Sequence, residues 1–136
     1  MNKRQKILIV DDAKFNRDIL KEFLGETYDY LEAENGNQAV QIMEENLGID
    51  LMLLDINMPQ MDGLTATKTI RSLERQDAKT IPIIAMTANA FREDAERCME
   101  AGMNAHLAKP LDDEKMIVAL KQCMADNSDV KLHENL

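Results

Sequence analysis

The chain has 136 residues, of which 45% are hydrophobic and 30% are charged, and its formal net charge is −9. This length is that of one ordinary domain, and no apolar run approaches the roughly 18 residues of a membrane-spanning helix, so we expect a cytoplasmic globular domain. The negative charge disfavours direct binding to nucleic acid and to anionic membranes, which leaves other proteins as the expected partners.

Short apolar runs alternate with segments of helical periodicity, a pattern typical of βα units around a parallel sheet. The predicted strands are residues 6–10, 28–32, 50–54, 81–86 and 105–108. The runs at 6–10 and 50–54 are almost entirely apolar. We therefore expect these two strands to be buried on both faces, in the middle of a doubly wound α/β sheet.

Five amphipathic helices are predicted from apolar residues that repeat every three or four positions. Their apolar stripes are Phe15/Ile19/Phe23, Val40/Met43/Leu47, Ala66/Ile70/Leu73, Phe91/Ala95/Cys98 and Met116/Leu120/Cys123. Gly25, Gly48 and Gly102 each come just after such a stripe, where a left-handed backbone is expected. Cysteines on apolar stripes favour buried, reduced thiols. We expect a single domain at residues 1–125, and the polar residues 126–136 form a tail or linker.

Polar residues follow four of the five predicted strands. In an open parallel sheet with strand order 2-1-3-4-5, the first, third, fourth and fifth strands are neighbours, so their carboxyl ends share one rim. The residues at these ends are Asp11 and Asp12, Asp55, Thr87, and Lys109. Three clustered carboxylates repel one another and favour a hard divalent cation such as Mg²⁺. With Asp55 as nucleophile, Lys109 as counter-charge and Thr87 as donor, the set suits phosphoryl transfer.

The motifs ILIVDD, LLDINMPQMDG, IIAMTANA and HLAKPLD, between about Ile7 and Leu120, resemble those of response regulator receiver domains. The resemblance implies a flavodoxin-like (βα)5 fold and a phosphoacceptor role in a two-component system or phosphorelay. The phosphoryl group would come from a phosphohistidine on a histidine kinase or phosphotransfer domain, and the phosphorylated state would act on a downstream protein.

The same resemblance assigns roles to individual residues. Asp55 is the implied phosphoacceptor. Asp12, Asp55 and the backbone carbonyl of Asn57 are the implied Mg²⁺ ligands, with Asp11 acting through water. Lys109 and Thr87 are implied to contact the phosphoryl group, and the bond from Lys109 to Pro110 is implied to be cis. The domain would then be a switch that catalyses its own phosphorylation and dephosphorylation.

His106 departs from the commonest family pattern, which has Tyr or Phe three residues before the lysine. Together with the stretch MTANAF, it makes the chain similar to receivers attached to hybrid histidine kinases. By the family pattern Thr87 and His106 are the switch pair, and His106 moves inward when Thr87 is drawn toward the phosphoryl group. Asn57 and Asn89 are the positions expected to tune the lifetime of the phosphorylated form.

Each of these residues has a plainer interpretation when it is taken alone. Asp11 and Asp12 could cap a helix, Asp55 could be a turn residue, Thr87 a local cap and Lys109 a solvated side chain. The convergence of four strand ends on one rim favours a site instead.

Two other functions remain open at this point. The first is a Mg²⁺-dependent phosphatase with Asp55 or Asp11 as nucleophile, similar to haloacid dehalogenases. Against it, Ala13 stands where their D-x-D motif needs a second acid, and no cap domain is long enough to enclose a substrate. The second is a degenerate receiver that serves as a docking module, whose sign would be a missing acid or lysine.

Overall fold

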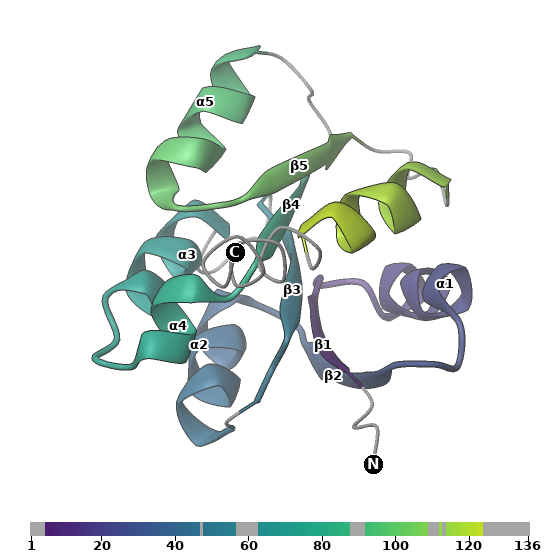
Figure 1. The fold of residues 1–136 in the computed structure, drawn as a ribbon, viewed down its shortest axis with the longest axis horizontal. Helices are drawn as coiled ribbons and strands as arrows, with labels where there is room; N and C mark the ends of the chain where they lie inside the picture. Colours follow the sequence, from purple (N-terminus) through teal and green to yellow (C-terminus); the bar gives the residue numbers. More distant parts are fainter. Residues whose placement is uncertain are drawn as a thin grey trace, which may run out of the picture.

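The computed structural model describes residues 5–46, 48–56, 63–87, 92–108, 112 and 114–123. Within these residues, parallel strands form one sheet in the order β2-β1-β3-β4-β5 (Figure 1). The strands are β1 (Lys6–Val10), β2 (Asp29–Ala33), β3 (Leu51–Asp55), β4 (Ile83–Thr87) and β5 (Ala105–Ala108). The predicted fold class and strand order are therefore confirmed.

Helices cover both faces of this sheet (Figure 1). They are α1 (Lys14–Leu24), α2 (Gly36–Glu45), α3 (Gly63–Arg71), α4 (Gln76–Thr80), α5 (Arg92–Ala101) and the yellow helix of residues 114–123. Helix α1 and the helix of residues 114–123 pack on one face, and α2, α3 and α5 pack on the other. The short helix α4 was not predicted, because five residues are too few to display an apolar period.

The predicted strand bounds hold for β1 and β5 and are shifted for the other three strands. Strand β4 begins two residues later than predicted, because Pro82 has no N–H and contributes only its carbonyl, which accepts a hydrogen bond from the amide of Met52 at 2.9 Å. Strand β3 includes Asp55, which pairs with Met86 of β4. Asp55 is thus the last residue of the strand, held in the ladder, and not the first residue after it.

The central strands place alternate side chains in two separate cores, because successive residues of a strand point to opposite faces. Leu8 and Met52 contribute to the core under α2 and α3, whereas Ile7 and Leu51 contribute to the core under α1 and the helix of residues 114–123. All of β3 and β4 is buried, and so is β1 after its first residue. Burial of β1 and β3 on both faces is confirmed.

The predicted apolar stripe of α1 is wrong at one position. Phe15 is 74% exposed, and the buried residues of the helix are Arg17, Leu20 and Leu24, which recur at the spacing of one helical face. The inward face is therefore rotated from the predicted one, because Leu20 and Leu24 supply a second apolar pair at helical spacing and it is this pair that packs in the core. The buried positions Met43, Ala66, Ile70, Cys98, Met116 and Leu120 agree with the prediction, and Leu47 and Phe91 lie outside the described residues.

Three further expectations can be compared with the described residues. Gly25, Gly48 and Gly102 all have a positive φ, as predicted. Cys98 is buried, Cys123 is half-buried, and neither forms a disulfide. No helix among the described residues has both the length and the apolar character that crossing a membrane requires.

Two arginines join helix ends on the side of the sheet that carries α2, α3 and α5. Arg71 donates hydrogen bonds from Nε and Nη2 to the carbonyl of Gly102, at 3.0 and 2.9 Å, and from Nη1 to the carbonyl of Ala78 at 3.0 Å. Arg75 donates from Nη2 to the carbonyl of Asn46, just after α2, at 3.0 Å. Helix C-termini carry partial negative charge, so these cations stabilise the ends that they contact.

Candidate functional site

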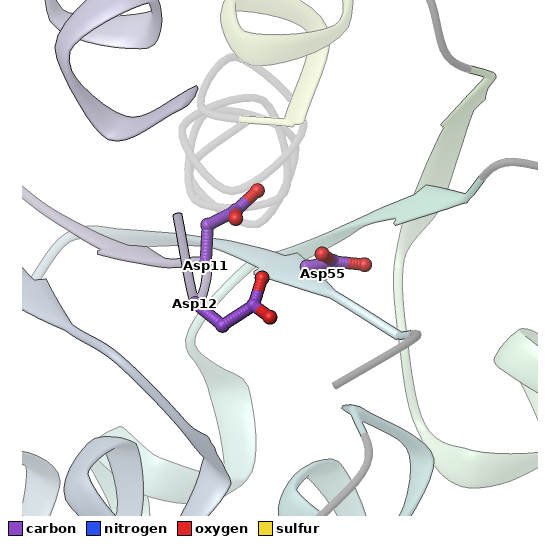
Figure 2. Close-up of side chains that lie close together, drawn as sticks. All are labelled: Asp11, Asp12 and Asp55. Atoms are coloured by element: carbon purple, nitrogen blue, oxygen red, sulfur yellow. The ribbon is translucent and has the colours of Figure 1, made fainter. Parts of the chain in front are cut away.

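Three carboxylates meet at one edge of the sheet (Figure 2). Asp11, Asp12 and Asp55 each offer an oxygen, and the three oxygens lie within 4.8 Å of one another. Asp11 and Asp12 directly follow β1, and Asp55 ends β3. Because β1 and β3 are adjacent and parallel, both strands deliver their carboxyl ends to the same place. The predicted convergence of the three acids is confirmed.

Without a bound cation, the burial of these carboxylates is electrostatically unfavourable. Asp11 is 1% exposed and Asp55 is 3% exposed, whereas Asp12 is exposed to solvent. Two carboxylates removed from water and set beside a third repel one another, and the repulsion is relieved when a cation binds between them. Mg²⁺ typically takes one or two carboxylates and keeps several water ligands. The donor set, two buried oxygens and one at the solvent boundary, fits that preference.

Asp11 is held by several hydrogen bonds. Its Oδ1 accepts a hydrogen bond from the amide of Ala13 at 2.9 Å, and Nδ2 of Asn16 lies 3.4 Å from both carboxylate oxygens. Its own amide donates to the carbonyl of Ala33 in β2 at 3.1 Å. The plainer interpretation of Asp11 as a helix cap is wrong, because the N-cap of α1 is Ala13, which makes no side-chain cap, and the backbone amide that Asp11 bonds is that of Ala13 itself. The same side chain still points into the cluster.

The backbone that follows Asp55 is fixed by hydrogen bonds. The amide of Ile56 donates to the carbonyl of Met86 at 3.1 Å, which extends the pairing of β3 with β4 past Asp55. Helix α3 then begins at Gly63, whose amide lies 3.4 Å from the carbonyl of Ile56. Thr67 reinforces this first turn, since its buried Oγ1 donates to the carbonyl of Gly63 at 2.8 Å.

Thr87 ends β4 and is 1% exposed. Thr87 pairs with Ala108 of β5, and Met86 beside it pairs with Asp55, so the threonine belongs to the same edge as the acids. Lys109 follows Ala108 directly in the chain. The predicted roles of Lys109, Pro110, Asn57 and Asn89 fall on positions outside the described residues.

His106 lies on β5 and is exposed. It pairs with Ala85 of β4 and lines a groove of about 700 Å³ together with Met99 of α5 and Ala119 of the helix of residues 114–123. The outward position of the ring is the one that the family pattern implies for the resting state. The structure thus places His106 on a surface beside the site and outside the acidic cluster.

Sequence reasoning missed Arg17 and Asn16, two residues that hold Asp11. A signal was present, since Arg17, Leu20 and Leu24 share one helical face, and a charged residue on the apolar face of a helix marks a buried polar contact. Asn16 had no comparable signal, because a polar residue near a helix start is ordinary.

The sequence matches known proteins over almost the whole described region. Residues 7–121 match the family model of the response regulator receiver domain. Sensor histidine kinase RcsC of Salmonella typhi is 40% identical over 125 residues, which is 91% of this chain and 12% of that protein. The chain therefore spans only a small part of this curated relative.

Two solved structures with the same architecture are receiver domains, one with bound magnesium and one in complex with a phosphotransfer protein. The receiver domain of sensor histidine kinase PA1611 from Pseudomonas aeruginosa, with a magnesium ion coordinated in its active-site cleft, is 35% identical, with a TM-score of 0.80 and coverage of 90% of this chain and 99% of that one. The receiver domain of Ssk1 from Saccharomyces cerevisiae, solved with the histidine phosphotransfer protein Ypd1, is 29% identical, with a TM-score of 0.81 and coverage of 90% of each chain.

Proposed function

This chain belongs to the family of response regulator receiver domains, and we propose from that premise that it accepts a phosphoryl group on Asp55 with the help of Mg²⁺. The observation that carries the proposal is the approach of the Asp11, Asp12 and Asp55 carboxylate oxygens to within 4.8 Å at the ends of β1 and β3. A nucleophile beside a cation site is what phosphoryl transfer requires.

In the proposed reaction an oxygen of Asp55 attacks the phosphorus of a phosphohistidine in line with the phosphorus–nitrogen bond. That bond breaks, its electron pair stays on the imidazole, and an aspartyl phosphate forms. Asp12, Asp55 and the carbonyl of Asn57 would hold Mg²⁺, with Asp11 acting through water. Bound Mg²⁺ supplies positive charge to the phosphoryl oxygens. Burial of Asp55 beside β4 restricts the approach of water and fixes the nucleophile.

Two further residues complete the proposed site and switch. Lys109 would pair with a phosphoryl oxygen as a point charge, and the hydroxyl of Thr87 would donate a hydrogen bond to another. Thr87 would move toward the phosphoryl group, and His106 would turn inward from the surface into the space beside β5. This coupling would convert one covalent change into a new surface around β5 that a downstream protein can bind.

The proposed donor is a histidine kinase or a histidine phosphotransfer domain. Support comes from the relatives, since RcsC is a sensor histidine kinase and Ssk1 was solved with a phosphotransfer protein. We assign residues 1–125 to the receiver and residues 126–136 to a tail or linker. A cytoplasmic location, either as a free regulator or as a part of a larger kinase, belongs to the same proposal.

Intact-mass spectrometry after incubation with acetyl phosphate and Mg²⁺ tests the assignment. The wild-type chain should gain one phosphoryl group that hydroxylamine removes. Asp55→Asn should gain none, and Asp50→Asn is the matched control, because Asp50 precedes the opposite end of the same strand. Undiminished labelling of Asp55→Asn would contradict the proposal.

A further inference from the structure

Arg17 is a buried cation that contacts two elements at once. The residue is 7% exposed, its Nε donates to Oε1 of Glu32 in β2 at 3.0 Å, and its Nη1 donates to the backbone carbonyl of Asp11 at 2.7 Å. Burial of a guanidinium is unfavourable unless its charge is paired and its donors are bonded. Glu32 provides the charge, so the bond to Asp11 is made by a group that is itself held in place.

The carbonyl of Asp11 belongs to the peptide that joins Asp11 to Asp12. A peptide unit is planar, so fixing this carbonyl also fixes the direction in which the chain enters Asp12. The preceding peptide is fixed too, since the amide of Asp11 donates to the carbonyl of Ala33 at 3.1 Å. The backbone is therefore held on both sides of Asp11, and the bond from Arg17 is the one that lies between the two acids.

We propose that Arg17 is a positioning residue for the cation site: its guanidinium holds the Asp11–Asp12 peptide so that both carboxylates face Asp55. The inference rests on the proposed function only in taking Mg²⁺ as the cation. In this proposal Arg17 does not itself bind the cation. Its effect passes through the backbone to two side chains of the cluster, and β2 takes part because Glu32 orients the guanidinium.

Lys21 offers a matched comparison within the same ion-pair network. Its Nζ lies 3.1 Å from Oε2 of Glu32 and 3.5 Å from Oδ1 of Asp18, so it pairs with the same glutamate from the same helix. Its ammonium group thus contacts acidic side chains and not the Asp11 carbonyl. Replacing Lys21 therefore removes one positive charge and one partner of Glu32, as replacing Arg17 does, while the bond to the Asp11 carbonyl stays.

Groups that orient metal ligands typically contribute about 10- to 100-fold to metal affinity. Arg17→Met keeps a long unbranched side chain and removes the charge and both donors. We expect this variant to bind Mg²⁺ at least about tenfold more weakly than the wild type. Lys21→Met should stay within about twofold, because the peptide between the two acids is undisturbed.

The experiment titrates the full chain with MgCl₂ in an isothermal calorimeter, for the wild type, Arg17→Met, Arg17→Lys and Lys21→Met. The ¹³C resonance of the Asp11 carbonyl, recorded without Mg²⁺, reports the hydrogen bond directly and should shift in the Arg17 variants only. Circular dichroism checks that each variant is folded. If Arg17→Met does not fold, Arg17→Lys decides the question, since lysine keeps the charge and loses the fork that spans Glu32 and Asp11.

A loss of Mg²⁺ affinity in the Arg17 variant that exceeds the loss in Lys21→Met, together with the shifted Asp11 resonance, supports the proposal. Equal affinities in the two variants, or an Arg17 variant that binds Mg²⁺ as tightly as the wild type does, would overturn it. If the wild-type chain itself binds no Mg²⁺, the proposed function fails, and that outcome is separate from a failure of the role of Arg17.

Discussion

Gly63 packs directly against Ile56 at the start of α3. A Cβ atom added to Gly63 would lie 2.7 Å from the Cα of Ile56 and 2.8 Å from the carbonyl oxygen of Asp55. Both neighbours are backbone atoms of the segment that carries the proposed nucleophile, so neither can rotate away as a flexible side chain would. The first turn of α3 and the end of β3 are thus in contact at a distance that only glycine permits.

We expect Gly63→Ala to lower the free energy of unfolding by about 1 to 3 kcal/mol, because the added methyl group overpacks a backbone contact. The variant should also accept phosphoryl from acetyl phosphate more slowly, since relief of the clash moves Asp55. Urea unfolding and intact-mass time courses measure the two effects. Lys68→Ala, at an exposed position of the same helix, is the control and should change neither. Wild-type behaviour of Gly63→Ala in both assays would refute the steric argument.

We expect Asp12 to contribute to Mg²⁺ binding and Lys109 to contribute to phosphoryl transfer but not to Mg²⁺ binding. Asp12→Ala removes a carboxylate that faces the cation site, so Mg²⁺ affinity should fall at least about tenfold. Lys109→Ala should leave Mg²⁺ affinity within about twofold, or tighten it, because the proposed site would lose a positive charge that repels the cation. Labelling by acetyl phosphate should nevertheless slow in both variants. Calorimetry measures the Mg²⁺ affinities, and mass spectrometry measures the labelling rates. An equal loss of Mg²⁺ affinity in the two variants would show that the two residues do not have separate roles.

Glu32 should make the stability of the domain depend on pH in the acid range. Partial burial alone would raise the pKa of Glu32, but hydrogen bonds from Lys21 and Arg17 outweigh it and hold the pKa below its ordinary value. A lowered folded-state pKa stabilises the fold above the unfolded-state pKa of about 4.3, and the stabilisation is lost as the pH falls through the folded-state value.

We therefore expect Glu32→Gln to reduce the free energy of unfolding by about 1 kcal/mol at pH 7, a modest figure because the carboxylate is partly exposed and screened by solvent. The difference from the wild type should shrink as the pH falls below about 4. Denaturant unfolding at a series of pH values measures it. Glu44→Gln, at an exposed position of α2, serves as the control. A difference that is the same at pH 7 and pH 3 would exclude the charge as its cause.

His106 should become less accessible when the site is activated. The chain has two histidines, and we expect the reactivity of the second, His133, to stay unchanged and to serve as an internal reference. Diethylpyrocarbonate should modify the exposed ring of His106 readily in the resting protein, and more slowly in the presence of beryllofluoride and Mg²⁺. Peptide mass spectrometry gives the two rates. An unaltered rate at His106, under conditions in which beryllofluoride is bound, would count against inward movement.

The fold could be predicted from the sequence because its strongest signals are local. The run from Leu51 to Leu54 is apolar and short, which fixes a central strand, and Asp55 directly after it marks the carboxyl edge. What could not be predicted depends on contacts between distant residues. The helical face shared with Leu20 and Leu24 indicates that Arg17 is buried, but its partners Glu32 and the Asp11 carbonyl are brought beside it only by the fold.

The hydrogen bonds of Arg71 should persist when the domain is acidified. Its acceptors are the carbonyls of Gly102 and Ala78 and the side-chain oxygen of Asn104, none of which gains a proton in mild acid. Such bonds are also little weakened by salt. By contrast, the ion pairs that join α1 to β2 through Glu32 are weakened both by acid and by salt. Acidification would therefore first loosen the contact between α1 and β2, which holds Asp11. The amides of α2, α3 and α5 on the opposite face of the sheet would keep their protection from hydrogen exchange for longer.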